Sequence, residues 1–243
     1  MKIMSKNSII IIPARLASTR LPNKPLLDIA GKPMIIRVVE QAQKSGVGEV
    51  VVACGDQQIF DLVEAHSFSA VMTDPNLASG SDRVYAAYKQ LNLKHEFIIN
   101  LQGDLPTVSP ELIIKINDDL ISSKADIATA AAKITDAEEK HNPNVAKAVI
   151  GFNMRALYFT RSACPWGEGD LYHHIGIYGY KKEVLERYVN FPPSPLEKRE
   201  RLEQLRALEN GLSISVSVVD SIPIGVDTKE DLEAARKVYI NRN

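Results

Sequence analysis

The sequence predicts an α/β fold with a mainly parallel, mixed sheet of the Rossmann-like kind, and two observations support this prediction. The first is the unbroken apolar run at Ser8–Ala14, which is typical of a strand buried on both faces of a parallel sheet. The second is the strand–helix–strand–helix–strand order that follows, the pattern of a mononucleotide-binding half. The 243 residues suffice for one large domain of this class.

The elements of the first half follow from apolar runs and their punctuation. Pro33 suits the first turn of a helix running to about Ser45, with Ile35 and Val39 on its inner face. Further helices are predicted at about 56–66, 82–91 and 110–123, the last starting at Pro110. Continuous apolar runs predict strands at 49–54, 69–73, 97–101 and 126–132.

After Asn142 the pattern changes to shorter β segments, at 146–150, 156–160 and 175–180, separated by polar turns. This arrangement predicts a partly antiparallel second half. Helices at about 196–210 and 228–241 flank a strand at 213–219, and Gly211 suits the end of the first of these helices. We expect a single domain, 1–243, with a nucleotide-binding half at about 1–135 and a second half at about 136–243.

Composition excludes several function classes. A net charge of -1 gives no field to attract a polyanion, so nucleic-acid binding is disfavoured. Cys54 and Cys164 form neither a disulfide framework nor a metal-binding spacing, which favours a reducing cytoplasm. The first apolar run is too short for a signal sequence or a membrane span, so we expect no membrane insertion and a cytoplasmic location.

A basic loop follows the first strand, with Arg15, Arg20 and Lys24 but no glycine. Phosphate loops usually bind the anion through glycine-rich backbone, so a triphosphate here would be held by side-chain cations. Ligands of α/β sheets bind at the carboxyl ends of the strands, which favours this role. A solvated basic loop is the alternative.

Two aspartates are candidate Mg²⁺ ligands. Asp104 follows the strand at 97–101, and Gly103 beside it would let the backbone approach a ligand closely. Mg²⁺ takes oxygen ligands and often only one or two protein carboxylates. The alternative for Asp104 is a turn cap, and for Asp227 a capping box with Glu230 at the start of the last helix.

Other polar groups are weaker candidates. His174 and Tyr178 share one face of a predicted strand by period two and lie roughly 13 Å apart along it, facing either a polar cavity or solvent. Glu203 and Gln204 flank a leucine stripe and are ordinary solvated residues unless they line a pocket. Trp166 is expected to be a packing anchor.

The order of the motifs resembles that of the 3-deoxy-manno-octulosonate cytidylyltransferases. The matching segments are IIPARLASTRLPNKPL, GKPMI, SGSDR, LQGD, NPN, LYFTRSACPW, HHIGIYGY, PSPLE, LEQLR and GVDT. They extend from Ile11 to Thr228 and so cover nearly the whole chain. The resemblance implies a three-layer nucleotide-diphospho-sugar transferase fold and a homodimer, with the second half binding the sugar and dimerising.

The resemblance also implies a reaction and residue roles. CTP and 3-deoxy-D-manno-octulosonate (Kdo) would give CMP-Kdo and pyrophosphate with Mg²⁺, for lipopolysaccharide synthesis. The triphosphate would be held by Arg15, Arg20 and Lys24, and the metal by Asp104 and Asp227. The cytidine would lie among Ser79, Gly80, Ser81, Asp82 and Arg83. The sugar acid would contact Gln102, Arg161, His174, Tyr178, Glu203 and Gln204.

One position departs from the family pattern and leaves the sugar acid open. Many relatives have Glu where this chain has Leu105, so a carboxylate role there cannot be transferred. An 8-amino analogue of Kdo or a sialic acid is the nearest alternative substrate. A dehydrogenase is disfavoured because no G-x-G-x-x-G follows the first strand. A nucleotide sensor would keep the basic loop without needing both aspartates on one metal.

Overall fold

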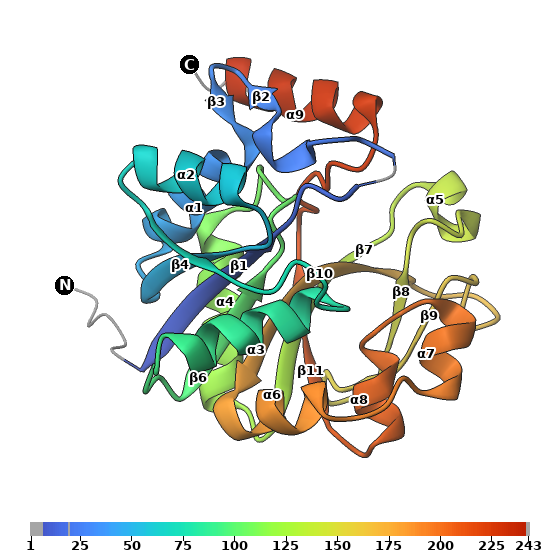
Figure 1. Cartoon of the computed structure of the whole chain (residues 1–243). Coiled ribbons are helices and arrows are strands. Elements are labelled where there is room, and N and C mark those ends of the chain that lie inside the picture. Colours follow the sequence, from blue (N-terminus) through green and yellow to red (C-terminus); the bar gives the residue numbers. More distant parts are fainter. Residues whose placement is uncertain (1–6, 19, 242–243) are drawn as a thin grey trace. The chain divides into compact units, whose positions relative to one another are not determined.

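The computed structural model describes residues 7–18 and 20–241, and these form two compact units. The first unit contains the described residues up to Ile114 together with those from Pro223 onward, so the chain returns to it at the end. The second unit is Lys115–Ile222. Each unit has its own part of the α/β architecture (Figure 1).

The first unit is built on four parallel strands in the order β6, β1, β4, β5. Their bounds are Ser8–Ala14 for β1, Glu49–Cys54 for β4, Ser69–Met72 for β5 and Phe97–Leu101 for β6. Ile9, Ile10, Ile11 and Ile12 are fully buried, although successive side chains point to opposite faces. Both faces of β1 are therefore covered, which confirms the prediction from the isoleucine run.

The helices of this unit alternate with its strands. They are α1 (Met34–Ser45), α2 (Gln57–Ala65) and α3 (Gly80–Gln90), and α4 (Pro110–Ser122) begins in it. Pro33 precedes α1 as its N-cap, whereas the sequence placed it in the first turn. The Met34 amide donates to the Leu27 carbonyl at 2.8 Å, which starts the helix one residue later.

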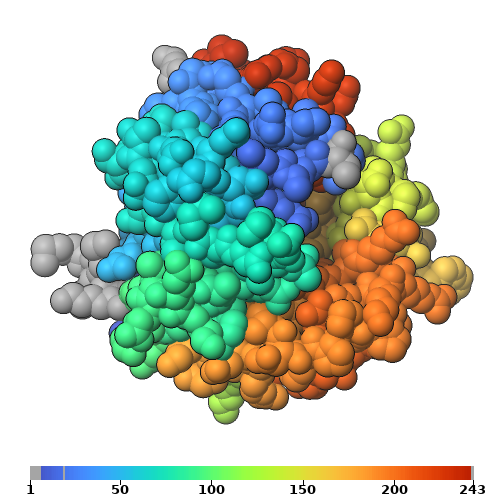
Figure 2. Space-filling model, viewed as in Figure 1, coloured from blue at the N-terminus to red at the C-terminus, as the bar shows by residue number. Residues whose placement is uncertain are grey.

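The C-terminal helix α9 (Lys229–Ile240) packs on the small hairpin of β2 (Asp28–Ile29) and β3 (Lys32–Pro33). Leu232, Ala235 and Tyr239 join Ile29 and Met34 in one hydrophobic cluster. In the space-filling view the red C-terminal residues lie against the blue N-terminal ones (Figure 2). This packing fixes where the chain re-enters the first unit.

The second unit has a mixed sheet. Strand β7 (Ile127–Lys133) is parallel to β11 (Ile214–Val219) and antiparallel to β10 (Tyr172–Lys181). The hairpin of β8 (Lys147–Ile150) and β9 (Ala156–Thr160) is joined to β10 through β8. The prediction of a partly antiparallel second half is confirmed, and the fold is mixed α/β with a mostly parallel sheet.

The helices of the second unit differ most from the sequence prediction. The single helix expected at 196–210 is wrong, because Arg201 adopts a left-handed conformation (φ 56°) and separates α7 (Pro195–Glu200) from α8 (Leu205–Glu209). Helices α5 (Ala137–His141) and α6 (Lys182–Val189) were not predicted. Trp166 is 99% exposed, so the expected packing role is also wrong.

Candidate active site

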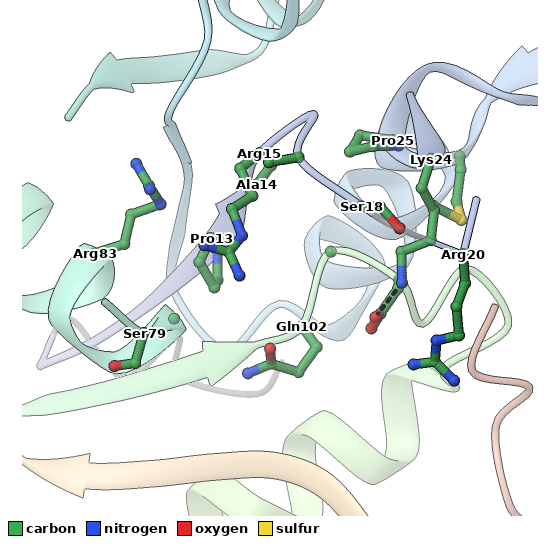
Figure 3. A pocket seen from close by; sticks show the side chains of 15 residues that line it. Pro13, Ala14, Arg15, Ser18, Arg20, Lys24, Pro25, Ser79, Arg83 and Gln102 are labelled. Atoms are coloured by element: carbon green, nitrogen blue, oxygen red, sulfur yellow. Dashed lines mark hydrogen bonds and ion pairs between the residues drawn. The ribbon is translucent and has the colours of Figure 1, made fainter. Parts of the chain in front are cut away.

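A cavity of about 380 Å³ opens in the first unit where β1 and β6 end. Its walls come from the loop after β1, the start of α3 and the turn after β6. Figure 3 shows Arg15 and Lys24 extending from the loop toward the strand end that carries Gln102. The lining residues are Pro13, Ala14, Arg15, Ala17, Ser18, Arg20, Lys24, Pro25, Met34, Ser79, Gly80, Arg83, Gln102, Gly103 and Asp104.

Lys24 joins the two predicted metal ligands. Its Nζ lies 2.8 Å from Asp104 Oδ2, the contact drawn in Figure 3, and 3.0 Å from Asp227 Oδ1. Arg20 Nη2 lies 3.0 Å from Asp227 Oδ2. The structure thus gathers two cations and two carboxylates, of which Lys24 and Asp227 are 203 positions apart in the sequence.

The backbone explains how Asp227 reaches Asp104. The Ile224 amide donates to Thr107 Oγ1 at 2.7 Å and the Val226 amide to the Asp104 carbonyl at 2.9 Å. Thr228 is the N-cap of α9, with its hydroxyl accepting from the Asp231 amide and Asp231 accepting from the Thr228 amide. The alternative of a capping box between Asp227 and Glu230 is therefore wrong by one residue, and the Asp227 carboxylate pairs with Lys24 and Arg20 instead.

The charges of this cluster stabilise one another. Burial lowers the pKa of Lys24, but the charge of Asp104 and hydrogen bonds to both aspartates outweigh it and raise this pKa above its ordinary value. Burial acts to raise the pKa of Asp227, yet Lys24 and Arg20 lower it overall. Lys24 and Asp227 are consequently both charged at neutral pH. The donor set is oxygen-only and already holds a cation between two carboxylates, which fits Mg²⁺.

Gly103 is needed for a close approach within the protein. A Cβ there would lie 2.9 Å from the Pro13 carbonyl oxygen and 3.3 Å from Ile35 Cδ1. The neighbour that requires glycine is thus the end of β1, and Gly103 also lines the cavity. Because Gly103 lies so close to Pro13, the turn at Gln102–Asp104 packs directly on the end of β1, where the basic loop begins.

The segment from Ser79 to Arg83 mainly organises the start of α3. Ser79 and Asp82 form a capping box, with the Ser79 hydroxyl accepting from the Asp82 amide at 3.1 Å. Ser81 is buried, and its hydroxyl accepts from Asn100 at 3.5 Å. Of the five predicted residues, Ser79, Gly80 and Arg83 line the cavity. Ser81 and Asp82 are not lining residues and instead make the hydrogen bonds just described.

Arg83 is 2% exposed and holds the loop that follows β5. Nη1 donates to Thr73 Oγ1 at 2.6 Å and to the Asp74 carbonyl at 3.0 Å, and Nη2 donates to the Pro75 carbonyl at 3.3 Å. Burial, the largest contribution, lowers its pKa. Arg83 itself lines the cavity, and its guanidinium is held in place by its bonds to residues 73–75.

The predicted sugar residues divide between the units. Gln102 lies in the first unit, where its amide donates to Asn100 Oδ1 at 3.0 Å. His174, Tyr178 and Gln204 come together in the second unit, with the His174 and Tyr178 rings 5.6 Å apart. The ladder between β10 and β7 is irregular between Ile175 and Tyr178, which interrupts the strict alternation assumed from the sequence.

His174 is buried with both ring nitrogens engaged. The Thr129 hydroxyl donates to the Ile177 carbonyl at 2.8 Å, so it accepts from His174 Nε2 at 3.0 Å. Nδ1 then accepts from the Gln204 amide at 3.5 Å. Burial, with a smaller effect of His173, lowers the pKa of His174 to about 3. His174 is therefore a neutral residue that orders its neighbours.

Arg161 and Glu203 are engaged within the second unit. Arg161 donates to the carbonyls of Glu200 at 2.8 Å, Pro143 at 2.9 Å and Arg201 at 3.3 Å. Glu203 accepts from the Tyr188 hydroxyl at 3.1 Å. By contrast, the Tyr178 hydroxyl has no hydrogen bond to any residue that the structure describes, which makes it the most available donor of the set.

Sequence reasoning missed two supporting residues. Asn100 lies 1% exposed inside β6 and holds Gln102. Thr129 is fully buried in β7 and holds His174. Each is the polar member of an otherwise apolar strand segment, FIINL for one and IATAAA for the other. A polar residue in a buried strand must find a partner, and that requirement could have identified both.

Comparison with known proteins identifies the family. Residues 9–214 match the cytidylyltransferase family model. The 3-deoxy-manno-octulosonate cytidylyltransferases of Parvibaculum lavamentivorans and Rhodospirillum centenum are 54% and 51% identical, over 100% and 95% of this chain and 96% and 93% of theirs. The structure of CMP:2-keto-3-deoxy-manno-octonic acid synthetase complexed with CTP is 37% identical, with a TM-score of 0.93 over 97% of this chain and 99% of that one. The chain therefore belongs to the 3-deoxy-manno-octulosonate cytidylyltransferases, a group of nucleotidyltransferases.

Proposed function

We propose that this chain transfers the cytidylyl group of CTP to Kdo, giving CMP-Kdo and pyrophosphate. The observation that carries the proposal is the pairing of Asp104 and Asp227 around Lys24 at a cavity that Arg15 and Arg20 also line or border. Cations for a polyphosphate and carboxylates for a metal are the groups that nucleotidyl transfer requires. The relatives named above, which this chain matches over 96% and 93% of their length, bear this activity in their names.

The reaction begins with the anomeric hydroxyl of the sugar acid attacking the α-phosphorus of CTP in line. The bond from the α-phosphorus to the bridging oxygen breaks, pyrophosphate leaves with the electron pair, and the proton of the attacking hydroxyl passes to solvent. Arg15, Arg20 and Lys24 stabilise the charge that develops on the leaving group. Holding the two substrates in line supplies much of the remaining rate enhancement.

Asp104 and Asp227 are the residues that would hold Mg²⁺. When bound, the ion would neutralise phosphate charge and favour ionisation of the attacking hydroxyl. Their oxygen-only donor set and the cation already between them suit this role. Arg83 and the capping box of Ser79 and Asp82 would keep the cavity wall in shape for the cytidine.

For the sugar acid, we assign direct contact to Tyr178 of the second unit, with His174 and Gln204 of the same unit ordering it. Arg161 and Glu203 would act through the backbone that they hold. The buried Leu105 supplies no carboxylate at the position where many relatives have one. The preference for Kdo over its 8-amino analogue is accordingly the most specific claim of the proposal.

The test is pyrophosphate release with Mg²⁺ and CTP, comparing Kdo, 8-amino-Kdo and N-acetylneuraminate, with ATP, GTP and UTP as controls. Release with CTP and Kdo alone is the expected result. Release with another sugar acid would keep the reaction and change the substrate. No release from any pair would overturn the proposal, and unchanged CTP affinity without Mg²⁺ would then favour a nucleotide sensor.

We also propose a cytoplasmic homodimer that serves lipopolysaccharide synthesis. Phe152 and Trp166 are fully exposed in the second unit, and Met154 and Leu157 are more than half exposed. Exposed apolar residues in this number favour a protein interface.

Among the described residues no helix is both long and apolar enough to cross a bilayer. Sedimentation of the wild type and of Phe152→Ser would test the dimer, which the variant should weaken.

A further inference from the structure

The cation between the two carboxylates suggests a role for Lys24 beyond phosphate binding. We propose that Lys24 is a built-in substitute for the metal ion, which keeps Asp104 and Asp227 neutralised until a nucleotide triphosphate draws it away. Nucleotide and metal would then bind together rather than independently. This inference rests on the proposed function, since it deepens the role of the same residues.

Geometry is the first support. The Lys24 ammonium is 2.8 Å from one carboxylate and 3.0 Å from the other, so it occupies the space between them. The Lys24 side chain is only 13% exposed, compared with 35% for Asp104 and 47% for Asp227. The ammonium therefore approaches from the protein side, while both carboxylates keep an open side toward solvent.

Charge balance is the second support. Arg20 and Lys24 contribute two positive charges, and Asp104 and Asp227 contribute two negative charges. A divalent cation entering this neutral cluster would be attracted by the two carboxylates but repelled by the two nearby cations, so the net attraction would be small. A triphosphate that engages Arg20 and Lys24 would remove this opposition. By linkage, the metal would then strengthen nucleotide binding by the same factor.

The backbone around Lys24 permits such a change. Asn23 adopts a left-handed conformation (φ 55°), and the Leu26 and Leu27 amides donate to the carbonyls of Asn23 and Lys24. Pro25 next to Lys24 is buried. The main chain is thus fixed while the long, flexible side chain can redirect its ammonium from carboxylate to phosphate.

The test is Mn²⁺ binding, measured as loss of the free-ion electron paramagnetic resonance signal, without nucleotide or sugar. Lys24→Met keeps side-chain length and removes the charge, and we expect it to bind Mn²⁺ at least about tenfold more tightly than the wild type, since a unit charge near the ion is removed. Lys32→Met is the matched control, because Lys32 pairs with Glu40 in the same unit and touches neither aspartate. The control should bind Mn²⁺ as the wild type does.

Two further variants locate the effect. Arg20→Met should give a smaller gain, because among the described residues Arg20 forms an ion pair with Asp227 alone and its side chain is 64% exposed. Adding Asp104→Asn to Lys24→Met should abolish the gain. Lys24→Met binding no tighter than wild type, or a gain that survives Asp104→Asn, would overturn the proposal. Melting temperatures of all variants ensure that folded proteins are compared, and Arg20→Met still tests the idea if Lys24→Met does not fold.

The coupling to nucleotide gives a second readout. In the wild type, a saturating non-hydrolysable CTP analogue with an α,β-methylene bridge should tighten Mn²⁺ binding strongly, and in Lys24→Met the tightening factor should be smaller. An equal factor in both proteins would overturn the proposal. Failure of the proposed function would appear separately, as absence of pyrophosphate release from the wild type, and the nucleotide-free titrations would still decide the role of Lys24.

Discussion

The amide of Val226 donates a hydrogen bond to the carbonyl of Asp104 at 2.9 Å, and this one bond aligns the last segment of the first unit with the turn after β6. Asp227, the next residue, is thereby carried to the same ammonium that Asp104 binds. The positions of the two carboxylates therefore depend on this backbone contact between their segments.

Replacing Asp104 by Asn should keep the fold and lower kcat at least about 100-fold, the size of single electrostatic contributions to catalysis. The amide retains the shape but cannot balance Lys24 or a metal. Steady-state pyrophosphate release measures the effect, and Asp118→Asn on the exposed surface of α4 is the control. Turnover near that of the wild type would remove Asp104 from the mechanism.

Replacing Thr228 by Ala should lower the free energy of unfolding by about 1 kcal/mol, the usual value for an N-cap hydroxyl. The lost acceptor serves the Asp231 amide at 3.2 Å. Urea denaturation measures the change, and Thr228→Ser should restore most of the stability. Equal loss in the Ala and Ser variants would show that the methyl group rather than the cap matters.

Replacing Gly103 by Ala should lower the free energy of unfolding by about 1–3 kcal/mol, because overpacking displaces backbone. The new Cβ would meet the Pro13 carbonyl oxygen at 2.9 Å. Gly176→Ala is the matched control, since a Cβ there would have no heavy atom within 4 Å. If both variants unfold at the same denaturant concentration, the close approach is not constraining.

His174 should make the protein less stable as the pH falls. Its pKa in the folded protein is about 3, below the ordinary 6.5, so between these values the unfolded chain binds a proton that the native state does not. The resulting loss is absent above about pH 6.5 and reaches about 2 kcal/mol at pH 5. His174→Gln should show a correspondingly smaller difference in unfolding free energy between pH 7.5 and pH 5.

The control for this experiment is His66→Gln, at an exposed histidine of the first unit. It should leave the pH dependence of the wild type unchanged. The same pH dependence in His174→Gln as in the wild type would contradict the assignment of a neutral, buried imidazole.

Replacing Tyr178 by Phe should raise KM for the sugar acid several-fold and leave KM for CTP unchanged, as expected when one contact to one substrate is lost. Stability should change by less than about 0.5 kcal/mol, since no described residue accepts from this hydroxyl. Tyr188→Phe is the contrasting variant: its hydroxyl donates to the Glu203 carbonyl at 2.9 Å, and its loss should cost about 1 kcal/mol of stability. Parallel rises in both KM values for Tyr178→Phe would argue against the assignment.

The sequence allowed correct prediction wherever a local pattern determines structure. Ser8–Ala14 is a strand because only a doubly covered strand can bury every isoleucine, and the strands at 49–54 and 97–101 follow the same logic. The basic loop and Asp104 could be placed at one sheet edge because parallel strands end together.

Prediction failed where the local structure depends on a contact with a distant residue or on a single backbone dihedral angle. The break at Arg201 depends on a left-handed backbone that no leucine spacing reveals. The role of Asp227 depended on whether it or Thr228 caps α9, a difference of one residue that the contacts of Asp104 and Lys24 determine. The engagement of the two His174 nitrogens depended on Thr129, which lies on another strand, and on Gln204, which precedes α8.

The return of the chain to the first unit also has a consequence for biosynthesis. Lys24 and Asp227 are separated by 203 positions, and α9 packs on residues near the start of the described chain. On the ribosome, the N-terminal strands can assemble long before the second carboxylate has been synthesised. The nascent chain thus carries Arg20 and Lys24 long before Asp227 is made, and the charge cluster is complete only once the segment around Asp227 has emerged.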